Sequence, residues 1–135
     1  MKVTVDNPPV KVKPEVDDRV LASIEPSVLE DSYVYVHCSF DNEWEDALIR
    51  IWKTTFLVDL SSGAKSQLIH AENISIAPLW TVISDNKTHN FILIFSALPK
   101  SCTQFDLIEE ISQPGGFYIK GIQRNMLDVY HVKMQ

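Results

Sequence analysis

Residues 41–46 hold the densest group of metal-binding side chains in the sequence. The segment contains four carboxylates and one amide, on Asp41, Asn42, Glu43, Glu45 and Asp46. Oxygen atoms of this kind are the ligands that Ca²⁺ prefers, so the segment is a candidate calcium site. It lacks the glycine and the ligand spacing of an EF-hand, however, and we favour the alternative that it is a charged, solvated loop between strands. No motif in the chain predicts a cofactor.

Aromatic side chains suggest a second kind of site, a surface that binds carbohydrate. Flat rings stack on the apolar faces of sugars, while acids and amides accept the hydrogens of sugar hydroxyls. Tyrosine also packs on half-buried sheet faces, which is the alternative use of these residues. The candidate ligand-binding residues are Tyr33, Tyr35, Trp44, Tyr118 and Tyr130.

The two cysteines do not form a recognisable catalytic or metal-binding pattern. Cys38, Trp52 and Cys102 follow the order of an immunoglobulin disulfide and its tryptophan, but the tyrosine expected two positions before the second cysteine is missing. We therefore predict two unbridged thiols. His37 adjoins Cys38, yet neighbouring side chains of a strand point to opposite faces, so the pair cannot act together. With no G-x-S-x-G motif either, the sequence predicts a protein that is not an enzyme.

The elements that must position these residues are strands. Val, Ile and Thr contribute 32 of the 135 residues and Ala only 6, a balance that favours pleated structure over helix. Short apolar runs recur along the chain, separated by turn residues such as Ser61-Ser62-Gly63 and Pro114-Gly115. We predict strands at residues 16–24, 33–40, 47–52, 54–60, 67–76, 90–95, 104–108, 116–122 and 129–134. In residues 33–40 the alternation predicts a core face of Val34, Val36, Cys38 and Phe40, with Tyr33, Tyr35, His37 and Ser39 on the opposite face. Residues 91–95 are apolar on both faces, which predicts a central strand. The number and spacing of the strands predict an all-β fold, an antiparallel two-sheet sandwich of about eight strands, with a closed barrel as the alternative.

The chain divides into an extended N-terminal arm, residues 1–14, and a single β-sandwich domain, residues 15–135. Pro8, Pro9 and Pro14 interrupt the arm, which predicts an edge strand or a loose tail. The first residues show no apolar signal-peptide core, and the longest wholly apolar run is residues 91–95. We expect no membrane insertion. The compartment stays open: the cell envelope or the exterior if a leader was removed, and the cytoplasm otherwise.

Charge is unevenly distributed along the chain. The net charge is −6, but residues 15–46 alone carry ten acids and one base. An acidic protein of this kind is a poor match for nucleic acid, because binding to a phosphate backbone requires a basic surface. An acidic patch on one region predicts instead a surface that a partner protein recognises.

The second half of the chain resembles a known type of module. The segment L-P-K-x-x-x-x-F-D-L-I-E at residues 98–109 is the most specific element, flanked by residues 71–78, 90–95 and 116–122. This series resembles uncharacterised immunoglobulin-like β-sandwich modules of bacterial envelope proteins, some of which precede thioredoxin-like or other catalytic domains. The resemblance implies an accessory module. We therefore predict a non-catalytic module that binds another protein or a neighbouring domain through an exposed sheet face or the acidic surface. The alternative is a carbohydrate-binding module that uses exposed Tyr and Trp side chains.

Overall fold

The computed structural model describes residues 3–6, 33–43, 46–84 and 87–134. Within these ranges the regular secondary structure consists of β-strands, without helices. The all-β class predicted from the sequence is confirmed. In this part of the chain no helix is long and apolar enough to span a membrane. The strands are β1 (Val3–Asp6), β2 (Val34–Asp41), β3 (Ala47–Ile49), β4 (Thr55–Asp59), β5 (Lys65–Glu72), β6 (Thr81–Ile83), β7 (Thr88–Phe95), β8 (Gln104–Glu109), β9 (Tyr118–Gln123) and β10 (Val129–Met134).

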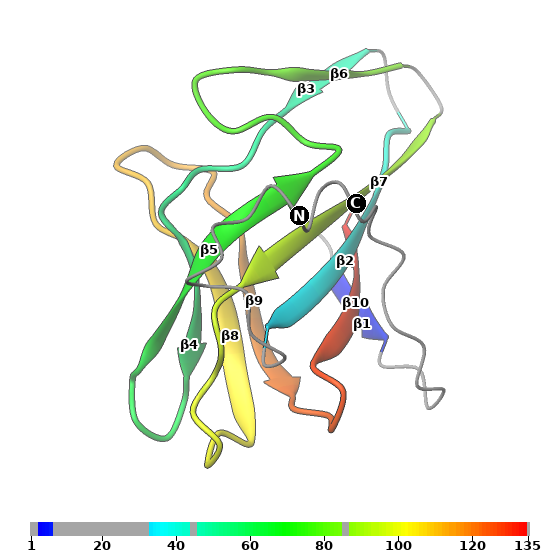
Figure 1. Cartoon of the computed structure of the whole chain (residues 1–135). Helices are drawn as coiled ribbons and strands as arrows, with labels where there is room; N and C mark the ends of the chain where they lie inside the picture. The colour runs from blue at the N-terminus through cyan, green and yellow to red at the C-terminus, as the bar shows by residue number, and fades with distance from the viewer. Residues whose placement is uncertain (1–2, 7–32, 44–45, 85–86, 135) are drawn as a thin grey trace.

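Eight strands form one sheet in the order β1-β10-β2-β7-β5-β4-β8-β9, and β3 pairs with β6 in a separate small sheet. β5 joins the two halves of the large sheet, because it pairs with β7 along one part of its length and with β4 along another. Figure 1 shows the large sheet curled into a half-barrel, with the small sheet above one end. The arm supplies β1, which pairs with β10 and lies at the end of this order.

One pairing in the large sheet departs from the purely antiparallel arrangement that the sequence suggests. β10 runs parallel to β2, with His131 beside His37, whereas the other described pairings of the large sheet are antiparallel. Parallel neighbours need a long connection, and here most of the domain separates the two strands. The pairing places β10 between β1 and β2, and Tyr130, Val132 and Met134 of this strand belong to the core.

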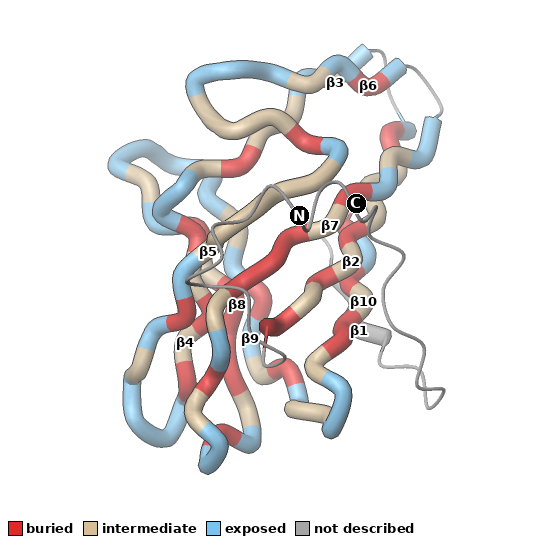
Figure 2. Tube along the Cα trace, viewed as in Figure 1, coloured by how far each residue is buried: buried red, intermediate tan, exposed pale blue. Residues whose placement is uncertain are grey.

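The concave side of the curled sheet encloses the main hydrophobic core. The inward residues of β2, Val34, Val36 and Cys38, are almost fully buried, as the alternation in residues 33–40 predicts. The two halves of the sheet meet across this core, since the rings of Phe105 on β8 and Tyr130 on β10 pack edge to face with centroids 5.0 Å apart. Figure 2 shows these buried residues running along the strands that face the interior.

The predicted strand positions agree with the structure to within two residues except at four places. The predicted strand 47–52 ends at Ile49, followed only by an isolated bridge at Ile51. The predicted strand 16–24 lies outside the described residues. The predicted run 67–76 ends early, at Glu72, because Asn73 adopts a positive φ of 64° that breaks the extended chain. β6 was not predicted, since three residues are too short to produce a clear alternation. β7 lies between β2 and β5, which confirms the central position expected for residues 91–95.

Both turns suggested by the sequence have the backbone that they require. Gly63 and Gly115 have φ values of +76° and +106°, the region in which glycine is favoured. In the β4–β5 turn the carboxylate of Asp59 accepts hydrogen bonds from the Ser61 N–H, the Ser61 hydroxyl and the Ser62 hydroxyl. This turn lies at the end of the half-barrel remote from the small sheet (Figure 1).

Candidate functional site

The small sheet presents one apolar side to solvent. Leu48 on β3 lies opposite Val82 on β6, and their side chains are 55% and 64% exposed, while the neighbouring Ile83 is 2% exposed. Arg50 directly follows β3, and Trp80 directly precedes β6. In β6 the middle position is exposed and the last position is buried (Figure 2).

Among the described residues, Arg50 is held by aromatic rings and a backbone carbonyl and forms no ion pair with a carboxylate. Its guanidinium carbon lies 3.8 Å from the ring centroid of Trp80 and 4.9 Å from that of Trp52. Its Nη1 donates to the carbonyl oxygen of Pro78 at 3.2 Å. Such cation–π contacts fix the position of the group while leaving hydrogen-bond donors that a ligand could use.

An open pocket of about 220 Å³ lies beside this arginine, between the small sheet and the end of the half-barrel. The loop that follows β8 forms another wall. Gly116 allows this loop to pass close to the backbone of β8, because a Cβ at position 116 would lie 2.5 Å from the carbonyl oxygen of Glu109. The pocket is lined by Phe40, Leu48, Ile49, Arg50, Trp52, Ile74, Trp80, Phe91, Glu109, Ile111, Gln113, Pro114, Gly115, Phe117 and Met134.

Glu109 places a carboxylate in this mostly apolar lining. The residue ends β8, is 8% exposed, and accepts a hydrogen bond from the backbone N–H of Trp52 at 3.1 Å. Burial raises the pKa of Glu109, and the backbone hydrogen bonds from Trp52 and Phe117 and the charge of Arg50 only partly oppose this rise. A carboxylate that is costly to ionise and that faces a pocket is a typical feature of a binding or catalytic site.

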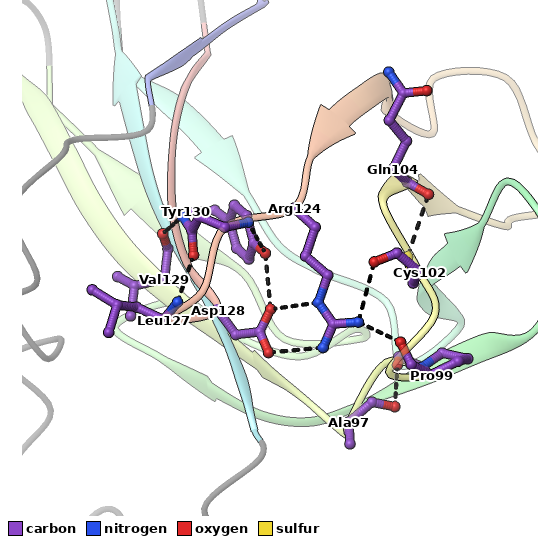
Figure 3. A network of polar contacts seen from close by, with 11 residues as sticks. Ala97, Pro99, Cys102, Gln104, Arg124, Leu127, Asp128, Val129 and Tyr130 are labelled. Atoms are coloured by element: carbon purple, nitrogen blue, oxygen red, sulfur yellow. Dashed lines mark hydrogen bonds and ion pairs between the residues drawn. The ribbon is translucent and has the colours of Figure 1, made fainter.

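The opposite end of the half-barrel contains a second arginine, and all three of its guanidinium nitrogens donate hydrogen bonds to protein oxygens. Arg124 donates from Nε and Nη2 to the two carboxylate oxygens of Asp128, each at 3.1 Å, and from Nη1 to the carbonyls of Pro99 and Cys102. The hydroxyl of Tyr130 donates to the same carboxylate at 2.8 Å. Figure 3 shows that the network ties the β9–β10 connection to the loop before β8. These contacts serve the fold.

The predicted aromatic ligand residues do not converge on one surface. Tyr33 is 6% exposed and Tyr35 half-buried, on the convex side of the sheet as predicted, but packed among isoleucines. Tyr130 was expected on an exposed face and is instead 0% exposed, because the parallel pairing and the curl of the sheet turn it into the core. Tyr118 is 47% exposed and bonded to Asp106, and Trp44 lies outside the described residues.

The candidate calcium loop is described only in part. Asp41 is already engaged, because its carboxylate accepts a hydrogen bond from the Thr88 hydroxyl at 2.8 Å and lies 3.4 Å from the Lys133 ammonium. Glu43 and Asp46 are exposed, and Glu45 lies outside the described residues. In the described ranges no three His, Cys, Asp or Glu side chains are grouped as a metal site would require. The calcium site therefore stays a prediction.

Cys38 and Cys102 are both free and buried. Burial raises the pKa of each thiol, most strongly for Cys38, which is enclosed in the core. A thiol that stays protonated is a poor nucleophile, so neither cysteine has the character of a catalytic group.

The residues that form the pocket were not identified from the sequence. Arg50 and Trp52 alternate within the predicted strand 47–52, which is a usable signal for a shared face. Trp80 lies two positions after Pro78, in a stretch without a regular alternation of apolar and polar residues. Glu109 closes an apolar strand and so resembles an ordinary solvated strand end. Nothing local in the sequence relates Glu109 to Trp52, since 57 positions separate them.

Comparisons with known proteins add no further information on this site. No family model matches the chain, and neither a curated protein nor a solved structure matches it significantly. The functional argument therefore rests on the lining, charge and surroundings of the pocket.

Proposed function

We propose that the protein is a non-catalytic interaction module that binds a partner polypeptide through the apolar surface of the small sheet. One observation carries the proposal: three large apolar side chains of the small sheet and its flank are each half or more exposed. Their exposed fractions are 55% for Leu48, 50% for Trp80 and 64% for Val82. A cluster of exposed apolar side chains rimmed by polar residues is typical of protein-binding surfaces.

The composition of this surface supports a protein partner. Trp80 and Arg50 belong to the residue types that contribute most to binding energy at protein interfaces. The contact between them holds both side chains in a defined position before a partner arrives, which lowers the entropy lost on binding. Most of the acidic region 15–46 lies outside the described residues, so its role in recognition stays a prediction.

The absence of catalysis is part of the same proposal. Arg50 and Glu109 are the charged residues among the described residues that line the pocket. An acid–base reaction needs a second titratable group positioned against the first, and a nucleophile needs an activating base. Neither arrangement is found in this lining, which suits binding better than chemistry.

The relation to immunoglobulin-like sandwich modules is likewise a proposal. The strands of the large sheet enclose one core between two facing halves, as in a sandwich. The parallel pairing of β10 with β2 and the strand shared by both halves are also compatible with a barrel.

Panning a phage-displayed library of random peptides tests the proposal. We expect the wild-type protein to enrich peptides with aromatic or aliphatic side chains, and the Leu48→Ser/Val82→Thr double variant to retain at least tenfold fewer of them. Leu127→Ser is the matched control, because Leu127 is 48% exposed on the β9–β10 connection. Thermal unfolding confirms that each variant is folded. The proposal fails if the wild type enriches no peptide family over bare support, or if the double variant enriches the same one.

A further inference from the structure

The pocket beside Arg50 has the size of a single substituted ring. Its volume is about 220 Å³. A protein cavity of about 150 Å³ accommodates benzene, so this pocket has room for a six-membered ring and several small substituents. The pocket is open to solvent, which allows the ring to belong either to a free small molecule or to the end of a longer chain.

The walls of the pocket are suited to stacking. Trp52, Trp80 and Phe117 line it together with further apolar side chains. Aromatic faces bind flat rings and also the apolar C–H faces of pyranoses. Trp80 is 50% exposed, so a ligand can reach it without rearrangement of the fold.

The polar residues in the lining distinguish a hydroxylated ring from an apolar one. Arg50 supplies donors, Glu109 supplies acceptors, and Gln113 supplies both. A purely apolar ring that displaced water here would leave the remaining donors and acceptors of these groups unsatisfied, at a cost in binding energy. Ring hydroxyls both donate and accept, so they can satisfy all three side chains.

The charges of the lining favour a neutral ligand. Arg50 and Glu109 carry opposite charges and interact electrostatically, as the effect of Arg50 on the pKa of Glu109 shows. An anion would be repelled by the buried carboxylate and a cation by the guanidinium. Neutral hydroxyls meet neither penalty and can form charge-assisted hydrogen bonds with both groups.

We propose that this pocket binds a neutral pyranose, a single sugar ring stacked on the Trp80 side of the pocket with its hydroxyls directed to Arg50, Glu109 and Gln113. The site differs from the aromatic residues that the sequence suggested, Tyr33, Tyr35, Trp44, Tyr118 and Tyr130. It also goes beyond the interaction surface, because it requires no partner polypeptide.

Ligand-observed saturation-transfer NMR tests the proposal with methyl glycosides of glucose, galactose, mannose and N-acetylglucosamine. We expect at least one glycoside to bind saturably in the millimolar range. Indole is the apolar comparison and is expected to bind at least fivefold more weakly than that glycoside. Absence of saturable binding by all four glycosides up to about 50 mM, or tighter binding of indole, would overturn the proposal.

Variants then locate the binding. We expect Trp80→Ala to weaken glycoside binding at least tenfold and Glu109→Gln about fivefold, with Leu127→Ser, at the opposite end, within twofold of wild type. Equal binding by all three variants would place the sugar elsewhere and refute the pocket. Val82→Asp separates this proposal from the interaction surface, because Val82 is 64% exposed and does not line the pocket. This variant should lose the peptides selected on wild-type protein while still binding the glycoside.

Discussion

The two ends of the half-barrel each hold an arginine, and the two side chains are used in opposite ways. At the end of the half-barrel remote from the pocket, the closed end, Arg124 donates through two nitrogens to Asp128 and is only 17% exposed. At the pocket end, Arg50 lies over Trp80 and Trp52 and donates to one carbonyl oxygen. A guanidinium saturated by protein groups stabilises the fold, whereas one positioned by rings keeps donors for a ligand.

The buried carboxylates of the two ends show the same contrast. At the closed end, hydrogen bonds from Ser62 and Ser61 lower the pKa of Asp59 to about 2. At the pocket end, burial raises the pKa of Glu109 despite its own hydrogen bonds. The closed end therefore satisfies its charge internally, and the pocket end retains a charge that costs stability. Such a cost is common where a group serves binding.

The largest expected effect is the difference between removing the two arginines. Arg124→Ala removes the ion pair from the mostly buried Asp128 carboxylate, which keeps only the Tyr130 hydroxyl, and removes one hydrogen bond from each of two backbone carbonyls. We therefore expect a loss of about 3 kcal/mol in the free energy of unfolding. Arg50→Ala removes cation–π contacts and one hydrogen bond at a partly exposed position and should cost less than about 1 kcal/mol. Urea denaturation measures both values.

Lys133→Ala is the control for this pair of variants. The Lys133 side chain is 54% exposed, so its ion pair with Asp41 should contribute at most about 0.5 kcal/mol to the free energy of unfolding. Equal losses for Arg124→Ala and Arg50→Ala would show that the two ends do not differ as described.

A smaller effect is expected from single hydroxyl groups. Tyr130→Phe removes an O–H that donates to Asp128 and accepts from the Asn125 N–H, inside the core. We expect a loss of about 1–2 kcal/mol, because the Asn125 N–H loses this acceptor and the Asp128 carboxylate loses one of its donors while keeping Arg124. Tyr118→Phe removes a hydroxyl bonded to Asp106 from a residue that is 47% exposed, and should cost clearly less. Thermal unfolding of the two variants checks the order, and a larger loss for Tyr118→Phe would contradict it.

The smallest expected effect is a gain at the pocket end. In the folded protein the pKa of Glu109 lies above its unfolded value, so its carboxylate makes the fold less stable as the pH rises through and above the unfolded pKa. In Glu109→Gln the amide oxygen still accepts from the Trp52 N–H. We expect equal stabilities near pH 4 and a gain of up to about 1 kcal/mol for the variant at pH 7.

Urea denaturation at several pH values measures this gain as the difference between Glu109→Gln and wild type. Taking the difference removes the titration of His37, whose pKa is lowered to about 4 by burial and by His131 in both proteins. Asp59→Asn should behave in the opposite way, losing stability at neutral pH by an amount that shrinks as the pH falls toward about 2. The opposite result would be a difference in the free energy of unfolding, variant minus wild type, that is more negative at pH 7 than at pH 4. That result would show that the ionised Glu109 stabilises the fold.

Local patterns in the sequence predicted much of the fold. The alternation in residues 33–40 identified Val34, Val36 and Cys38 as core residues, and the unbroken apolar run 91–95 identified the central strand. These features depend on neighbours in the chain. The burial of Tyr130 depends instead on which strands pair and how the sheet curls, so its position in the sequence could not reveal it.

The candidate site was less accessible to prediction than the fold. Arg50, Trp52 and Trp80 come from two short segments on either side of β4 and β5, and Glu109 comes from a third segment. Each residue taken alone has an ordinary interpretation as a strand or loop position. Only their convergence on one pocket suggests a function.

The sequence by itself determined that this chain forms strands, because branched side chains, alternation and turn residues act over a few neighbouring positions. It also determined the acidic net charge, which is a property of composition. Only the tertiary structure decided which charges are satisfied and which face a pocket, as Arg124 and Arg50 show. The physical reason is that burial and hydrogen bonding of a charged group depend on residues distant in the chain, which meet only when the sheet has closed around its core.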